Sequence, residues 1–280
     1  MQLTVWGARG SIPVSGVEYD RYGGDTTCVC METDAGDTVI LDAGTGLRPL
    51  GNSLLNEKKN TFHFVLSHAH WDHLLGFPFF KPLYREGVTI FVHGCTYAQQ
   101  SIRNFLGTVM QPPFFPVTLD DVHANLVFDD ECRPDFEVGS LCCESIPLSH
   151  PNNGYGFRFT EGSKSVGFFP DNEFTFAHPG GKSRGEYVEF LRGVDLLVHD
   201  SEYLPEEYES YTRGWGHSVY SDTIDMAVDA EVQRLVLWHL NQDRDDDGVD
   251  ALLALAQQRA NEAGRDDLCV MARTGLVLDV

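Results

Sequence analysis

The sequence S-H-A-H-W-D-H at residues 67–73 decides how the rest of the chain is interpreted. It directly follows the apolar run 62–66, which has the length and composition of a buried β-strand. His68 and His70 are at positions i and i+2, so in an extended chain they face the same side. Asp72 and His73 stand where the chain must turn into the next element. Histidine and aspartate are metal ligands, and the spacing predicts that this segment gives two ligands to each of two neighbouring ions.

Other candidate ligands follow apolar runs elsewhere in the chain. They are His150, Asp171 and His239. Taken singly, each residue is explained equally well without a metal, as a surface histidine, a turn aspartate or the cap of a strand. Together they repeat one design, in which an apolar strand ends in a side chain that can bind a metal. A dinuclear site needs more ligands than one segment can supply, so these three complete the candidate set.

Short apolar runs bounded by glycine, proline and aspartate dominate the first two thirds of the chain, which is typical of β-strands. The expected strands span residues 2–6, 28–33, 38–41, 62–66, 89–93, 141–146, 155–160, 165–169, 196–198, 234–238, 268–271 and 276–278. Helical periodicity is clearest at 98–106, 220–230 and 250–263. This mixture predicts an α/β protein in which sheets pack face to face with helices outside.

The charge balance disfavours one class of partner. The chain has 280 residues, with 20 basic and 42 acidic side chains, and its formal net charge is −22. Two bound divalent cations would raise this only to −18. Tight binding of a long nucleic acid needs basic side chains over several phosphates, so a long RNA or DNA partner is not expected.

Composition also sets expectations for organisation and location. No apolar run approaches the ~20 residues of a membrane span, and residues 1–10 lack the pattern of a signal peptide. We therefore expect a cytoplasmic protein without membrane association, folded as a single domain over residues 1–280. Seven cysteines, an odd number, indicate reduced thiols. Cys28 and Cys30 are expected on one buried face of a strand, whereas Cys142 and Cys143 should point to opposite faces.

Several motifs resemble those of one known family. The run at 67–73 resembles the H-x-H-x-D-H signature of the metallo-β-lactamase superfamily. The sequences GARGSIP at 7–13, YGGDTTC at 22–28 and DAGTG at 42–46 are similar to motifs of one branch. That branch contains tRNA 3′-processing endonucleases and cyclic phosphodiesterases, and Asp25 stands where it usually has asparagine. The resemblance covers nearly the whole chain and implies a four-layer αββα sandwich with the metals at one edge, between the two sheets.

The resemblance also implies a role for each candidate ligand. The first ion would be held by His68, His70 and His150. The second would be held by Asp72, His73 and His239, and the carboxylate of Asp171 would bridge the two ions. Close relatives often have a second histidine at the position of Leu240, and His239 is taken as the ligand because it stands directly at the strand end.

Two further segments resemble motifs of the RNA-processing and phosphodiesterase members. They are VHDSE at 198–202 and GWGHS at 214–218. The resemblance implies that His217 donates a proton to the leaving oxygen and that Asp200 orients it, which places both with Asp72 among the catalytic residues. A histidine held by a carboxylate is a suitable acid near neutral pH. The alternative is that His217 only caps a helix that starts near Val219.

The residues favour phosphodiester hydrolysis by a hydroxide bound between two metals. The expected substrate is a small phosphodiester such as a cyclic nucleotide. One alternative is a tRNA 3′-end endonuclease, but that activity would need a basic arm to hold the tRNA, and this sequence contains none. Another is a thioesterase or lactonase, and the pair Asp200 and His217 argues against it. A di-iron redox protein would have glutamate at His70, and a metal-stabilised interaction module would not need an aligned proton donor.

Ligands without cysteine suit zinc, which we favour, followed by manganese or iron. Asp42 is expected either to support a ligating imidazole or to form a plain turn, and Arg9 or Ser11 could border the pocket. The aromatic stretch 110–116 is a candidate lid, subunit contact in a homodimer, or core cover.

Other polar groups are expected to have no functional role. The acidic stretch 243–248 imitates a calcium loop but has Ala254 at its twelfth position, so we interpret it as a solvated turn that caps the last helix. Four histidines have no convincing partners in the sequence and are expected at surface or core positions. They are His63, His93, His123 and His178.

Overall fold

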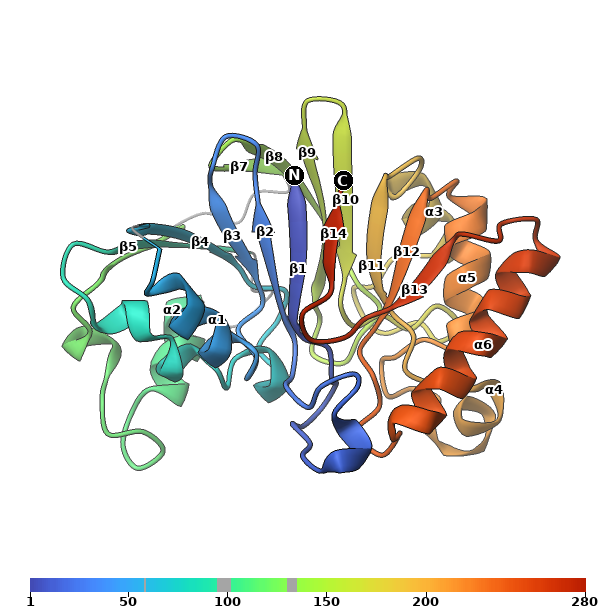
Figure 1. The fold of residues 1–280 in the computed structure, drawn as a ribbon, viewed down its shortest axis with the longest axis horizontal. Helices are drawn as coiled ribbons and strands as arrows, with labels where there is room; N and C mark the ends of the chain where they lie inside the picture. Colours follow the sequence, from blue (N-terminus) through green and yellow to red (C-terminus); the bar gives the residue numbers. More distant parts are fainter. Residues whose placement is uncertain (58, 95–101, 130–134) are drawn as a thin grey trace.

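The computed structural model describes residues 1–57, 59–94, 102–129 and 135–280. Within them, two seven-stranded sheets face each other, with helices on the outer side of each (Figure 1). This arrangement is the four-layer αββα sandwich that the sequence predicts. None of the helices in these ranges is long and apolar enough to cross a membrane.

The first sheet has the strand order β14-β1-β2-β3-β4-β5-β6. Its strands are β1 (Gln2–Gly7), β2 (Cys28–Glu32), β3 (Thr38–Leu41), β4 (Thr61–Val65), β5 (Thr89–His93), β6 (Asn125–Phe128) and β14 (Val277–Asp279). Strands β3 to β6 run parallel to one another, whereas β14, β1, β2 and β3 pair antiparallel.

The second sheet has the strand order β13-β12-β11-β10-β9-β8-β7. Its strands are β7 (Asp135–Val138), β8 (Leu141–Pro147), β9 (Tyr155–Glu161), β10 (Lys164–Phe169), β11 (Leu196–Asp200), β12 (Arg234–Trp238) and β13 (Cys269–Met271). Here β10 to β13 are parallel and β7 to β10 are antiparallel, so the two sheets share one plan.

The helices cover the outer faces of the sheets. On the side of the first sheet lie α1 (Leu47–Leu54) and α2 (Ile102–Val109), and on the side of the second lie α3 (Arg184–Phe190), α5 (Tyr220–Asp229) and α6 (Asp246–Glu262) (Figure 1). The short α4 (Pro205–Glu207) lies in the connection after β11. Short 3-10 turns connect the remaining segments, among them η2 (Trp71–His73) in the histidine-rich run.

Strand β2 shows how the core is divided. Its side chains alternate, so Val29 and Met31 belong to the large core between the sheets, and Cys28 and Cys30 belong to the smaller core under α1. The prediction that both thiols share one buried face is confirmed. In β8, Cys142 is exposed and Cys143 is buried, as expected for adjacent positions.

All of the expected strands are present, each with ends within two residues of the prediction. The sequence did not predict β6, β7, α1, α3 and the short α4. Strand β6 lies at a sheet edge with two exposed side chains, so its apolar pattern is weak, and α1 contains Pro49 and Gly51, which usually oppose helix formation. Cys95, Cys132 and the first part of the helix expected at 98–106 lie outside the described residues.

The last helix starts four residues earlier than expected. Asp245 caps its N-terminus by accepting a hydrogen bond from the backbone N–H of Gly248. The stretch 243–248 therefore does cap the helix, but it is not wholly solvated. Asp246 is buried and pairs with the guanidinium of Arg9 at 3.7 Å.

Parallel strands bring their carboxyl ends to one edge of each sheet, and the candidate ligands follow those ends. The run 67–73 follows β4, Asp171 follows β10 and His239 follows β12. Two of the strand-end residues have left-handed backbone conformations, with φ of 57° at Asp42 and 62° at His239. Such conformations are costly for residues other than glycine, and they occur preferentially at functional sites.

Candidate metal centre

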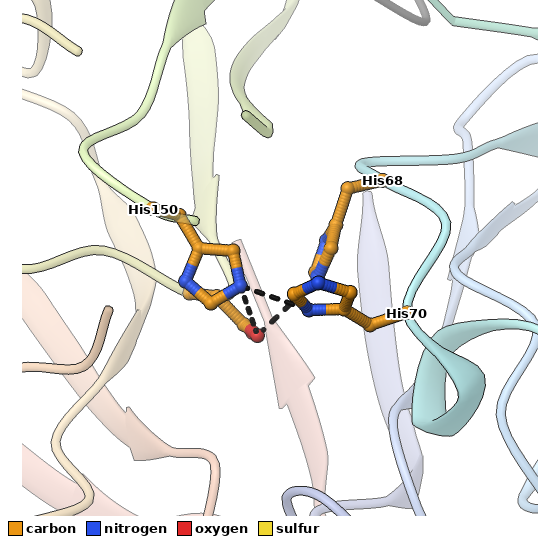
Figure 2. A group of neighbouring side chains, drawn as sticks. His68, His70 and His150 are labelled. Carbon is orange, nitrogen blue, oxygen red and sulfur yellow. Dashed lines mark hydrogen bonds and ion pairs between the residues drawn. The ribbon is translucent and has the colours of Figure 1, made fainter. Parts of the chain in front are cut away.

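The first group of candidate ligands contains His68, His70, His150 and Asp171. Their ligand atoms all lie within 4.8 Å of one another. The three imidazoles converge from two separate segments (Figure 2). Oδ2 of Asp171 lies 3.4 Å from Nε2 of His68 and 3.6 Å from Nε2 of His150. His70 places Nδ1 3.0 Å from Nε2 of His150.

The second group contains Asp72, His73, Asp171 and His239, again within 4.8 Å of one another. Oδ2 of Asp72 lies 3.3 Å from Nε2 of His73 and 3.3 Å from Nε2 of His239. Oδ1 of Asp171 lies 3.2 Å and 3.4 Å from the same two nitrogens. The structure thus brings all seven predicted ligands together, including His239, which stands where the strand-end argument placed it.

Asp171 belongs to both groups, and its two oxygens divide between them. Oδ2 faces the first group and Oδ1 faces the second. Three buried atoms here have no hydrogen-bond partner in the part of the chain that the structure describes: Oδ1 of Asp171, Nε2 of His68 and Nε2 of His73. Unpaired polar atoms are costly in a protein interior, and all three are lone-pair donors that a divalent cation would satisfy. The donor set therefore fits divalent metal ions.

The outer nitrogens of the imidazoles are held by other polar groups. Nδ1 of His73 lies 2.7 Å from the carboxylate of Asp42, and Nδ1 of His239 lies 2.8 Å from that of Glu202. Nδ1 of His150 donates to the carbonyl oxygen of Gly216 at 2.8 Å. Each contact keeps a proton on Nδ1, so in the neutral ring Nε2 is the lone-pair donor and is aimed at the centre, which is how ligating histidines are commonly oriented. The expected support of an imidazole by Asp42 is confirmed.

The N-terminal glycine loop closes the second group. The backbone N–H of Ser11 donates to Oδ2 of Asp72 at 2.8 Å, and Gly10 N donates to the carbonyl oxygen of Leu240 at 3.0 Å. A Cβ on Gly10 would lie 2.1 Å from the ring of His239, so only glycine fits there. Of the two residues expected to border the pocket, Arg9 is fully buried and donates to backbone carbonyls, among them that of Arg244, whereas Ser11 contacts the candidate ligand Asp72.

Beside the second group lie His217, Asp200 and Glu202. Nδ1 of His217 is 3.0 Å from Oδ2 of Asp200 and 3.5 Å from Oε2 of Glu202. The ring of His217 stacks on that of His239 at 4.5 Å. Helix α5 begins after Val219 with no side-chain cap, so the alternative that His217 only caps this helix is wrong.

The pKa shifts of these imidazoles differ in direction between the two groups. Burial, reinforced by neighbouring His68, lowers the pKa of His70 to about 4. Burial also holds the pKa of His150 well below its usual range, although Asp171 opposes this. Burial also acts to lower the pKa of His73 and of His239. The Asp171 carboxylate and other acids outweigh burial there and raise each pKa well above its usual range.

For His217, burial alone would lower the pKa. The carboxylates of Glu202 and Asp200 outweigh burial and raise the pKa of His217 to about 9. The imidazole is therefore protonated at neutral pH in the metal-free protein, and a nearby bound cation would lower its pKa from there. A protonated imidazole is the form that can donate a proton.

Sequence reasoning missed two acids and three partners. Glu202 and Glu173 are both buried, and each stands two residues after a candidate site residue, Asp200 or Asp171. Glu202 also ends the VHDSE segment, but sequence reasoning assigned it no separate role. Three histidines expected to lack partners have them. His63 contacts His93 at 3.1 Å, His93 contacts Asp129 at 2.8 Å, and His178 contacts Glu173 at 2.8 Å. His123 is exposed, as expected.

The sequence family described as "Beta-lactamase superfamily domain" matches residues 37–240. The chain therefore belongs to the beta-lactamase superfamily. Ribonuclease BN from Salmonella gallinarum (strain 287/91 / NCTC 13346) is 26% identical, and the alignment covers 75% of this chain and 83% of that protein.

Solved structures show the same fold over almost the whole chain. YhfI from Bacillus subtilis, described as a metallo-beta-lactamase fold protein, has a TM-score of 0.71 and 18% identity, with 99% of this chain and 98% of that chain covered. A zinc-bound PqqB from Methylobacterium extorquens has a TM-score of 0.70 and 16% identity, with 100% of both chains covered. A diphosphatase from the PhnP family has a TM-score of 0.66 and 20% identity, with 100% and 97% covered. The fold expected from the sequence motifs is confirmed.

Proposed function

We propose that this protein is a dinuclear metal-dependent phosphodiesterase that hydrolyses small phosphodiesters such as cyclic nucleotides. The observation that carries the proposal is the pair His217 and Asp200. Nδ1 of His217 lies 3.0 Å from Oδ2 of Asp200, and the His217 ring stacks on His239 of the second ligand group. Alkoxide is a poor leaving group near neutral pH, so hydrolysis of an alkyl phosphodiester needs a proton donor. Thioester hydrolysis needs none, because a thiolate leaves readily.

Each residue has a definite task. His68, His70 and His150 would hold one ion and Asp72, His73 and His239 the other, with Asp171 between them. Two such ions, when bound, would supply a hydroxide nucleophile at neutral pH and would neutralise the charge that develops on the phosphoryl oxygens. Zinc suits a set of imidazoles and carboxylates, and manganese or iron are the next candidates. The zinc-bound PqqB neighbour supports this choice.

His217 would protonate the leaving oxygen through Nε2, since Asp200 engages Nδ1. Asp200 also accepts hydrogen bonds from the backbone N–H groups of Ser218 and Glu202, so its orientation is fixed. The ring of His217 lies between ligands of both groups, 4.5 Å from His239 and 5.2 Å from His150 between ring centroids. This is the place from which a leaving group on a phosphoryl centre can be reached.

Two features support a small substrate with an aromatic part. The net charge of −22 opposes binding of a nucleic acid polymer. Two large aromatic side chains are exposed next to site residues: Trp71, 72% exposed between His70 and Asp72, and Trp215, 57% exposed two residues before His217. Exposed tryptophans beside such a site suit stacking of a nucleobase.

A second candidate function is RNA 3′-end processing. It is favoured by the similarity to Ribonuclease BN, which extends over 75% of this chain. The same site chemistry would serve, but the polymer would have to bind a strongly acidic protein.

The direct test is an assay of the metal-loaded protein with bis(p-nitrophenyl) phosphate, cyclic AMP, a tRNA with a 3′ extension and a thioester. We expect hydrolysis of the first two. Cleavage of the tRNA alone would favour the second candidate, and activity on the thioester alone would refute both.

The variant His217→Ala sharpens the test. It should keep its metal but lose about 10²-fold or more of kcat on cyclic AMP, because the leaving alkoxide is no longer protonated. His123→Ala is the matched control, since His123 is exposed and, among the described residues, its ring hydrogen-bonds to the backbone carbonyl of Tyr84 alone. Full activity of His217→Ala on cyclic AMP would remove the proton-donor role.

A further inference from the structure

Glu173 is a buried carboxylate two residues after Asp171, and it is only 1% exposed. Its two oxygens receive hydrogen bonds from donors on three separate segments. Oε1 accepts from the hydroxyl of Tyr208 at 2.5 Å and from Gly214 N at 2.7 Å. Oε2 accepts from Gly216 N at 2.7 Å and lies 2.8 Å from Nε2 of His178. A carboxylate with four donors around it is ordered by all of them.

Two of these donors belong to the loop that carries His217. Gly214 and Gly216 both have positive φ, 87° and 100°, so this backbone course suits glycine. A Cβ on Gly216 would lie 2.2 Å from Nδ1 of His150, which shows how tightly the loop packs against that imidazole. Glu173 thus fixes the backbone on the N-terminal side of His217.

The same loop reaches a candidate ligand. The N–H of Gly216 donates to Glu173, and the carbonyl oxygen of Gly216 accepts from Nδ1 of His150. On its other side, the loop is held by Asp200, which contacts His217 and accepts from Ser218 N at 3.1 Å. Two buried carboxylates therefore hold the loop, one before His217 and one after it.

The chemistry of Glu173 makes its charge important. An ionised carboxylate is only an acceptor, and the four groups around it can all donate. An amide of the same size would turn an NH₂ group toward two of those donors. The loop would have to move to relieve this conflict, and His217 would move with it.

We propose that Glu173 is a positioning residue that acts with Asp200 to place His217, and through Gly216 also His150, for the reaction. The inference rests on the proposed function for its catalytic consequence, but not for the geometry itself. A merely structural role would lower stability and affect every substrate alike. A positioning role affects most the step that needs His217, which is departure of a poor leaving group.

Glu173→Gln tests this with two substrates that differ in the leaving group. Cyclic AMP releases an alkoxide and bis(p-nitrophenyl) phosphate releases a stable phenolate. We expect kcat to fall roughly 10- to 100-fold for cyclic AMP and less than about threefold for bis(p-nitrophenyl) phosphate. Glu209→Gln is the matched control, because Glu209 is exposed on the same segment as Tyr208. It should change neither rate.

A second variant guards against loss of folding. Tyr208→Phe removes one of the four donors and leaves the charge of Glu173 in place. It should show the same selectivity for cyclic AMP with a smaller change, about three- to fivefold. Equal loss on both substrates, or no loss on either, in whichever variant folds would overturn the positioning role.

An independent readout is the imidazole spectrum of protein with ¹⁵N-labelled histidine, recorded without metal. Glu173→Gln should shift the ring resonances of His217 and His150 and leave that of His123 in place. Unchanged resonances for His217 would refute the inference even if the enzyme assay failed. If the unchanged protein hydrolyses neither diester while Glu173→Gln shifts the His217 resonances, the proposed function is refuted and the positioning role stands.

Discussion

The two ligand groups differ in what lies behind their imidazoles. In the second group, His73 is backed by the carboxylate of Asp42 and His239 by that of Glu202. In the first group, His150 is backed by a backbone carbonyl, and Nδ1 of His70 faces His150 itself. One group therefore places acids on both sides of its imidazoles, and the other shares a single carboxylate among three of them.

This difference sets the charge of each group before metal arrives. Burial without enough compensating acid keeps His70 and His150 neutral, which is the state that binds a cation. In the second group the pKa of His73 and of His239 is raised, because the acids outweigh burial. The first group is thus ready to bind, whereas the second exchanges protons for a cation and gains strong carboxylate ligands in return.

The largest effect should come from the residue that the two groups share. Asp171→Ala removes the only carboxylate of the first group and one of the two in the second. We expect loss of both ions and of essentially all activity, measured by elemental analysis and by the diester assay. Retention of two ions per chain would show that Asp171 is not the bridge.

A pair of single substitutions separates the groups. Asp72→Ala should leave one ion, held by the first group, because within the described ranges the imidazoles that pair with Asp72 are those of His73 and His239, both in the second group. His70→Ala should leave one ion in the second group. Either protein should lose at least about 100-fold in kcat, since the hydroxide needs both ions. Metal titration by calorimetry gives the stoichiometry, and two ions bound in both variants would contradict the division into groups.

A smaller effect is expected from the acid behind His239. Glu202→Gln keeps the size of the side chain but removes the charge that orients and polarises the imidazole. The affinity for the second ion should fall about 10- to 100-fold, with the first ion unaffected. Glu206→Gln provides the control, because Glu206 is exposed in the same connection. Equal weakening of both ions would mean that Glu202 acts on the whole site.

The site residues that could be predicted from sequence are those that directly follow a strand. His68, Asp171 and His239 each follow an apolar run that forms a parallel strand, and parallel strands bring their carboxyl ends to one edge. His150 follows β8, which runs in the same direction as β10 because both pair antiparallel with β9. The partners behind the imidazoles could not be predicted in this way. Glu202 and Glu173 are polar residues in connections, and only the packing of distant loops shows which imidazole or backbone group each one meets.

A buried imidazole that no carboxylate contacts in the described part of the chain also occurs outside the two ligand groups, at His199. His199 is fully buried, with its ring stacked between Phe169 and Phe174, and its Nδ1 donates to the carbonyl oxygen of Asp200 at 2.6 Å. Its Nε2 has no partner among the described residues. Burial lowers the pKa of His199 from 6.5 to about 4, although that hydrogen bond opposes the shift.

The folded state therefore favours neutral His199, and the unfolded chain takes up a proton first as pH falls. This contribution to stability is present above the unfolded pKa near 6.5 and is lost as pH falls toward about 4. Between pH 7 and pH 5 the loss should be roughly 1–2 kcal/mol in the free energy of unfolding. His199→Phe cannot be protonated, so its stability should fall less steeply over this interval than that of the unchanged protein. Urea titrations of both metal-free proteins at several pH values measure the two slopes, and identical slopes would show that His199 does not carry this acid sensitivity.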